Sequence, residues 1–210
     1  MYKSLIALFA GLSLSGLVLA AAPVAGQDYE VLDEPVSTQT GKERIEVTEA
    51  FWYGCPHCYN LEPMIESWAE ELPEDVTFTR LPATLGGAWN KHAVAFYAAK
   101  ELGILDQVHE DFFKAIQDEG RKLTEVDDIA AFFSDYGVSE EQAREMLTSF
   151  GVKSQVNRAH ARIRAYKLMG VPALIVDGRY VITPSKAGSL ENMLTIADAL
   201  VEETREERSQ

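Results

Sequence analysis

The chain contains two cysteines, which stand three positions apart in the run Cys55-Pro56-His57-Cys58. A disulfide within this run would close a very short loop, and the stabilisation that a disulfide provides grows with the length of that loop. The spacing therefore favours redox chemistry, with an inert local disulfide as the alternative. We expect no metal, since a zinc site would need two further ligands. The remaining histidines, which lack a partner motif, are His92, His109 and His160.

The cysteine pair lies where a predicted strand meets a predicted helix. Residues 45–53 alternate between apolar and polar side chains, and apolar residues follow Pro56 at helical spacing until Leu72-Pro73 ends the helix. Cys55 would then stand at the helix N-terminus, where free backbone N–H groups and the helix dipole favour an anion, so we expect it to be the thiolate nucleophile. His57 can direct a hydrogen bond or a positive charge toward the Cys55 sulfur. Because a stabilised thiolate favours the reduced form, the disulfide form would be a strong oxidant.

The rest of the chain is predicted to complete an α/β fold around this junction. A second strand covers 76–81, and a hairpin over 171–182 turns at Asp177-Gly178, a strong two-residue turn signal. Residues 86–169 show no convincing strand. Helices are expected at 88–102, at 105–116, at 125–136 with Thr124 as N-cap, after a Ser139–Gln142 capping box, at 152–169 and at 186–203. This order predicts a thioredoxin fold with an all-helical insertion domain.

The N-terminus has the layout of a secretory signal peptide, because Lys3 precedes an apolar run over 5–19 and small residues follow up to Gly26. A membrane anchor is disfavoured, since the run is shorter than the roughly 20 residues of a spanning helix. We expect cleavage between Ala21 and Gly26 and no membrane insertion afterwards. The expected division is a signal peptide (1–26), a first thioredoxin-fold half with the cysteine run (27–84), a helical insertion (85–169), a second half (170–204) and an acidic tail (205–210).

Composition and charge exclude several classes of protein. Hydrophobic residues make up 47% and charged residues 25% of the 210 residues, as in ordinary globular chains. The formal net charge of −14 makes nucleic acid and anionic membranes poor partners. The sequence thus predicts a folded protein whose acidity favours solubility.

Two segments resemble one known family. The run Glu49-Ala50-Phe51-Trp52-Tyr53-Gly54-Cys55-Pro56-His57-Cys58-Tyr59 resembles the active-site strand and turn of the DsbA family, the periplasmic disulfide-forming oxidoreductases. Gly170-Val171-Pro172-Ala173 resembles the cis-proline loop of that family. The likeness spans about residues 27 to 203. The chain departs from the pattern at Gly54, where relatives often have a larger residue.

The resemblance implies roles beyond the cysteine pair. Val171-Pro172 is expected to be a cis peptide that faces the cysteines and whose loop can pair with a bound substrate strand; the alternative is a simple strand-start proline. Glu49 shares the parity of the apolar strand residues, so we expect it to be buried beneath the cysteines and to relay protons for Cys58. The alternative is a solvated strand carboxylate. Trp52 and Tyr53 fit either the core or a client-binding surface.

The function that the resemblance implies is that of a disulfide oxidase, which introduces disulfide bonds into exported proteins through Cys55 and Cys58. We expect a periplasmic monomer without a bound cofactor, acting on reduced or unfolded clients and reoxidised by a membrane partner of the DsbB type. An exported isomerase or reductase is the main alternative, although known isomerases carry an N-terminal dimerisation domain for which this chain leaves little room. A client-binding chaperone and the glutathione-dependent transferase branch, which normally lacks the second cysteine, are the others.

Overall fold

The computed structural model describes residues 22–41 and 43–210. Residues 1–21 of the expected signal peptide (1–26) therefore lie outside the described residues. Among the described residues, no helix is both long enough and apolar enough to cross a membrane. Within the expected cleavage region, Ala25 forms a β-bridge with Tyr29.

Within the described residues, five strands form one mixed sheet in the order β1-β5-β4-β2-β3. The strands are β1 (Glu30–Val31), β2 (Ile45–Phe51), β3 (Val76–Pro82), β4 (Ala173–Val176) and β5 (Tyr180–Ile182). β2 runs parallel to β3 and antiparallel to β4, and β5 pairs antiparallel with both β4 and β1. Because β2 has a partner on each side, the position of its C-terminal end, which leads into the cysteine run, is fixed.

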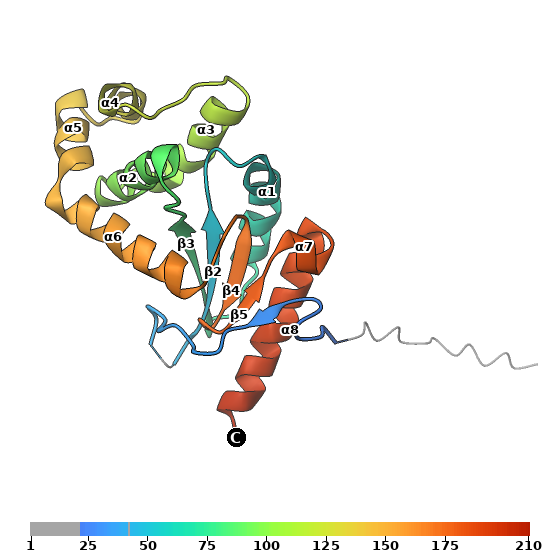
Figure 1. Ribbon diagram of the computed structural model, residues 1–210. Helices are drawn as coiled ribbons and strands as arrows, with labels where there is room; N and C mark the ends of the chain where they lie inside the picture. Colours follow the sequence, from blue (N-terminus) through green and yellow to red (C-terminus); the bar gives the residue numbers. More distant parts are fainter. Residues whose placement is uncertain (1–21, 42) are drawn as a thin grey trace, which may run out of the picture.

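Helices cover both faces of this sheet (Figure 1). On one face, at the right of the figure, lie α1 (Pro56–Glu70), α7 (Pro184–Ala187) and α8 (Leu190–Arg208). The other helices form a block at the upper left: α2 (Gly87–Glu101), α3 (Leu105–Gln117), α4 (Val126–Ser134), α5 (Glu140–Thr148) and α6 (Phe150–Ala165). The predicted fold class, a thioredoxin fold with a helical insertion, is confirmed, whereas the residue boundaries of its domains stay a prediction.

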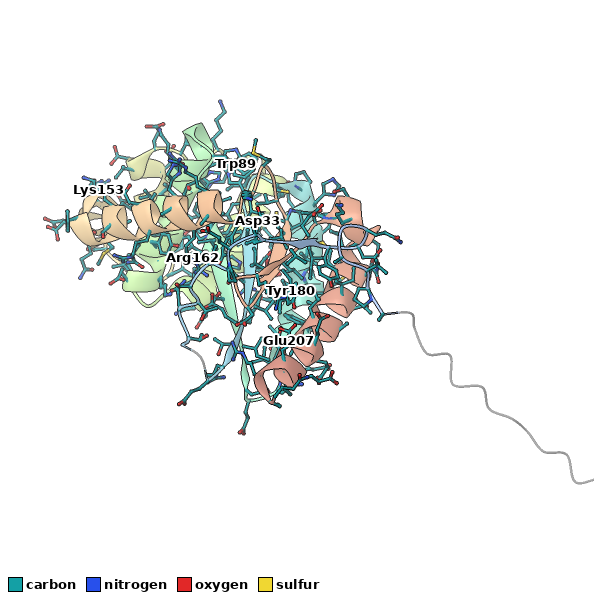
Figure 2. The ribbon with its side chains drawn as sticks, turned by 60° about the horizontal axis from the view of Figure 1, so that its bottom comes forward. Asp33, Trp89, Lys153, Arg162, Tyr180 and Glu207 are labelled. Atoms are coloured by element: carbon teal, nitrogen blue, oxygen red, sulfur yellow. The ribbon has the colours of Figure 1, made fainter. Side chains whose placement is uncertain are left out.

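The central strand β2 is buried along both faces, although its alternating pattern predicted one polar face. Ile45 and Val47 belong to the core formed with α1 and α8, whereas Phe51 belongs to the core shared with the helical block. Glu46, on the polar parity, is 1% exposed and binds Arg162 of α6 at 2.6 Å. Arg162 lies at the end of α6 that meets the sheet (Figure 2). The prediction failed because a buried carboxylate is tolerable when it is paired and hydrogen-bonded.

Two local signals predicted the backbone correctly. The hairpin turns at Asp177 and Gly178, whose φ angles are 51° and 64°. Gly178 is required there, because a Cβ atom would lie 1.9 Å from the Val36 carbonyl oxygen. Ser139 opens α5 with the predicted capping box, since its hydroxyl accepts from the Gln142 N–H at 3.2 Å and the Gln142 side chain accepts from the Ser139 N–H.

Some predicted helix ends are wrong. Glu125 rather than Thr124 is the N-cap of α4, and the Thr124 hydroxyl contacts the Glu125 carboxylate at 3.4 Å instead of capping the helix. α6 begins at Phe150, because the Ser149 hydroxyl caps it by accepting from the Val152 N–H. α6 also stops at Ala165, four residues earlier than predicted. The cap signals of single side chains therefore located some helix starts and missed others.

The C-terminal segment also differs from the prediction. The helix expected over 186–203 is two helices, since Ser189 interrupts it and caps α8 by accepting from the Asn192 N–H at 3.0 Å. α8 continues to Arg208, so most of the segment expected as an acidic tail is helical. Arg205 in this last part binds Asp75 at 2.7 Å, which attaches the helix end to the segment before β3.

Candidate active site

The two cysteines lie at the start of α1, directly after β2. Cys55 is the N-cap of the helix, and its Sγ accepts a hydrogen bond from the Cys58 N–H at 3.4 Å. Pro56 occupies the first helical position, where an N–H would have no intrahelical acceptor. Cys55 is 8% exposed and Cys58 is fully buried, and both are free thiols in this structure. An incoming thiol can therefore reach Cys55 and not Cys58.

The electrostatics of the two thiols are opposite. The pKa of Cys55 is lowered to about 6, chiefly by the hydrogen bond with the Cys58 side chain; burial opposes this, and the backbone N–H groups of Cys58 and His57 and the charge of His57 add to it. Burial, followed by the nearby Cys55 sulfur, raises the pKa of Cys58 strongly. The environment thus favours the thiolate form of Cys55 and the protonated form of Cys58.

The predicted cis-proline loop stands against the nucleophile. Val171-Pro172 is a cis peptide, as expected. The carbonyl oxygen of Val171 lies 3.5 Å from Cys55 Sγ, and Pro172 is buried at the start of β4. Segments more than a hundred positions apart in sequence are therefore in direct contact at the reactive sulfur.

Glu49 is buried beneath the cysteine pair, as predicted from its parity in β2. Its side chain is fully buried, and neither of its carboxylate oxygens has a hydrogen-bond partner among the described residues. Burial, and then the charge of Glu62, raise the pKa of Glu49 well above its ordinary value, although Arg80 Nε at 3.6 Å opposes the rise. Because the charge of Glu49 in turn raises the pKa of Cys58, the two groups interact.

A buried polar network extends from Glu49, and the sequence pattern did not predict most of it. Arg80 of β3 binds Glu62 of α1, and His109 Nε2 of α3 lies 3.1 Å from the same Glu62 oxygen. His109 Nδ1 lies 2.7 Å from the Tyr53 hydroxyl. His109, which lacks a metal-ligand motif, is therefore held by Glu62 and Tyr53. The signal that could have found Glu62 is its place on the apolar face of α1, four residues after Cys58.

The comparisons with known proteins agree with this site. The DSBA-like thioredoxin domain family matches residues 46–198. The chain belongs to this family. It is 40% identical to the thiol:disulfide interchange protein DsbA of Azotobacter vinelandii over 206 residues, with 95% of each chain covered, and 42% identical to DsbA of Pseudomonas aeruginosa over 203 residues, with 96% of this chain and 95% of the relative covered. The crystal structure of Pseudomonas aeruginosa DsbA matches with a TM-score of 0.85 at 40% identity, over 89% of this chain and 97% of that one.

As a DsbA-family enzyme, the protein is a thiol:disulfide oxidoreductase. Among the described residues, no group of three or more His, Cys, Asp and Glu side chains is placed to hold a metal ion.

The structure explains why this DsbA-family chain has Gly54 before the nucleophile. The Trp52 ring folds over Gly54, and a Cβ atom at position 54 would lie 2.3 Å from Trp52 Cζ2. Trp52 stacks on Trp89 of α2 with ring centroids 4.1 Å apart and an angle of 10° between the planes. The close approach of the indole therefore requires a residue without a side chain. Tyr53, by contrast, is 2% exposed and part of the core.

A cavity of about 720 Å³ opens beside the cis-proline loop. Its wall includes Val31, Leu168, Met169, Val171 and Pro172. Met169 is 92% exposed, which is unusual for a large apolar side chain. The cavity thus combines exposed apolar surface with the loop whose Val171 carbonyl oxygen lies 3.5 Å from Cys55 Sγ.

Proposed function

We propose that the enzyme rests as the Cys55–Cys58 disulfide and oxidises thiol pairs of exported proteins. A client thiolate attacks Cys55 Sγ, the bond between Cys55 and Cys58 breaks, and Cys58 leaves as a thiolate that takes up a proton. A second client thiolate then attacks the client sulfur of the mixed disulfide and expels Cys55 as a thiolate. The client leaves with a new disulfide, and two electrons remain on the enzyme as its reduced cysteine pair.

The observation that carries this proposal is the position of Cys55 Sγ as the acceptor for the first turn of α1. A lowered thiol pKa makes a sulfur a better leaving group, so the second step should favour release of Cys55 over release of the client. The same stabilisation favours the reduced enzyme and so makes its disulfide oxidising. His57 supports this role through its backbone N–H and its charge.

Further roles are proposed for the surrounding residues. Glu49 supplies the proton to Cys58 when that sulfur leaves and removes it again on reoxidation, since it is the buried acid whose charge acts on Cys58. The backbone of Val171-Pro172 pairs with an extended client segment beside Cys55. The neighbouring apolar cavity accepts client side chains.

The setting of the reaction is proposed from the N-terminal layout and the family. The protein acts as a monomer in the periplasm after removal of its signal peptide, on reduced or unfolded exported proteins. Because each turnover leaves two electrons on the enzyme, a membrane partner of the DsbB type that passes them to quinone restores the disulfide. No bound cofactor is needed for the exchange steps.

The test is equilibration of the purified mature protein with glutathione redox buffers, followed by thiol trapping and tryptophan fluorescence. We expect the disulfide to be reduced under much more oxidising conditions than a thioredoxin disulfide. A pair that keeps its disulfide under strongly reducing conditions contradicts the oxidase and favours a reductase. In parallel, Cys55→Ser and Cys58→Ser should abolish oxidation of a reduced client. A wild type that does not oxidise the client but suppresses its aggregation, with both variants suppressing it equally, would identify a chaperone.

A further inference from the structure

His109 occupies an apolar cage inside the helical block. It is 4% exposed, and its ring contacts the rings of Phe51, Phe113 and Phe96 at centroid distances of 5.2, 5.4 and 6.1 Å. A charged imidazolium is costly in such surroundings. Burial accordingly lowers the pKa of His109, even though the Glu62 carboxylate opposes this.

The Tyr53 hydroxyl determines which nitrogen of His109 carries the hydrogen. Tyr53 Oη lies 2.7 Å from His109 Nδ1 and makes no other hydrogen bond among the described residues. Burial raises the pKa of Tyr53 well above its ordinary value, so the phenol keeps its hydrogen and donates it to Nδ1. Nδ1 is therefore an acceptor, and the ring hydrogen is on Nε2, which lies 3.1 Å from a Glu62 oxygen although its N–H is not aligned for a hydrogen bond. Protonation of Nδ1 would leave the phenol hydrogen without an acceptor.

The groups facing this pair come from several elements. β2 contributes Glu49, α1 contributes Glu62 and the half-exposed Glu66, β3 contributes Arg80, and α2 contributes His92, whose ring lies 6.2 Å from the Tyr53 ring. His92 makes its hydrogen bond outside this network, since its Nε2 lies 2.9 Å from the Lys122 carbonyl oxygen. Burial lowers the pKa of His92, so Arg80 supplies the positive charge within this set.

With His109 neutral, one cation faces two fully buried carboxylates. Arg80 donates a hydrogen bond to Glu62. Its contact with Glu49 is weaker, because Arg80 Nε lies 3.6 Å from the carboxylate and Glu49 accepts no hydrogen bond within the described residues. Although burial opposes it, the contacts with His109 and Arg80 hold the pKa of Glu62 below its ordinary value. Glu62 is thus the ionised member of the pair and Glu49 the protonated one, because two like charges at such a site cannot both be stabilised.

We propose that Tyr53 and His109 are positioning residues that keep Glu49 protonated. By holding His109 neutral, they commit Arg80 to Glu62 and leave Glu49 as the acid that exchanges a proton with Cys58. This inference rests on the proposed role of Glu49 and extends it, because it gives the helical block a part in the reaction through α3.

Loss of the Tyr53 hydroxyl reverses this order of charges. In Tyr53→Phe, the Nδ1 lone pair of His109 has no donor, so His109 can bind a proton there and pair with Glu62 as an imidazolium. Arg80 is then free to pair with Glu49. The acid dissociation constant of Glu49 should rise about tenfold or more, which corresponds to a midpoint about one pH unit lower.

The experiment is a carbon-13 NMR titration of glutamate side-chain carboxyl groups in the reduced full-length mature protein, with Glu49 assigned by its loss in Glu49→Gln. Tyr53→Phe should lower the Glu49 midpoint. The double variant Tyr53→Phe with His109→Gln should restore it, because glutamine fills the site and cannot become a cation. Tyr136→Phe is the matched control, since the Tyr136 hydroxyl donates to Asp111 at 2.9 Å, away from His109.

Two outcomes overturn the inference: an unchanged Glu49 midpoint in Tyr53→Phe, or a lowered midpoint that the double variant does not restore. If Tyr53→Phe does not fold, the ring nitrogen-15 shifts of His109 in the wild type decide, because hydrogen on Nδ1 contradicts the inference and hydrogen on Nε2 alone supports it. Failure of the proposed function has a different signature. In that case Glu49→Gln reduces and reoxidises its cysteine pair at the wild-type rate, whatever the midpoints are.

Discussion

Ionisation of Cys55 should make the stability of the reduced enzyme depend on pH. The pKa of Cys55 is lowered from 9.0 to about 6, first by the hydrogen bond with the Cys58 side chain. A lowered pKa means that the folded state releases the proton more readily than the unfolded chain. The resulting stabilisation is complete above about pH 9 and is lost as the pH falls through about 6.

The size of the effect follows from the two dissociation constants. Their ratio of about a thousand corresponds to ~4 kcal/mol at the alkaline limit. At pH 7 the folded thiol is about nine-tenths ionised, whereas an unperturbed thiol is only ~1% ionised. Ionisation of Cys55 therefore raises the folding equilibrium constant about tenfold at this pH, which corresponds to ~1.4 kcal/mol. Near pH 5 the contribution vanishes. These values are upper limits, because Cys55, although only 8% exposed, still has contact with solvent, which screens the thiolate.

The assay is urea unfolding of the reduced wild type and the reduced Cys55→Ser variant at several pH values between 5 and 8. The difference between their free energies of unfolding should grow by up to ~1.4 kcal/mol from pH 5 to pH 7. In Cys58→Ala, which lacks the main cause of the lowered pKa, the rise should move to higher pH. A difference that stays flat from pH 5 to 8 would refute the stabilised thiolate and, with it, the physical basis for an oxidising disulfide.

Two further predictions concern stability. Gly54→Ala should lower the free energy of unfolding, measured by thermal unfolding, by ~1–3 kcal/mol, because the Trp52 ring must move to admit a Cβ atom. Gly151→Ala is the control and should not lower it, since the atom nearest to a Cβ at this α6 position is 3.9 Å away. Equal losses at both sites would contradict the argument. Ser139→Ala should lower the free energy of unfolding by ~1 kcal/mol through loss of the α5 cap, whereas Thr124→Ala should leave it unchanged, since Thr124 caps no helix.

The sequence was informative where local chemistry determines structure. The cysteine run could be placed at a strand-to-helix junction because the apolar period changes there from two to the helical spacing. The hairpin followed from Asp177-Gly178, since few residue pairs adopt two successive left-handed conformations. The orientation of Glu49 followed from its parity in β2. Each of these inferences needs only neighbouring residues.

The sequence was silent where distant segments decide. β1 has two residues, too few for an alternating pattern, and it forms because Glu30 and Val31 pair with β5. The burial of Glu46 depends on Arg162, which lies 116 positions away. The contacts around His109 bring together Arg80 of β3, Glu62 of α1, His109 of α3 and Tyr53, which stands two residues after β2. A single sequence contains no signal for such contacts, because each depends on how the helical block docks onto the sheet.

The two buried glutamates of β2 differ in how completely their carboxylates are hydrogen-bonded. Glu46 accepts from the Gln39 N–H at 2.7 Å, from the Thr48 hydroxyl at 3.0 Å and from Arg162 at 2.6 Å, so its charge is fully satisfied. Glu49 accepts no hydrogen bond within the described residues and shares its only nearby cation with Glu62. A buried carboxylate without hydrogen-bond partners gains by holding its proton, and burial accordingly raises the pKa of Glu49. The unsatisfied glutamate is the one that lies beneath the cysteines, where the proposed mechanism requires a proton each time Cys58 is released.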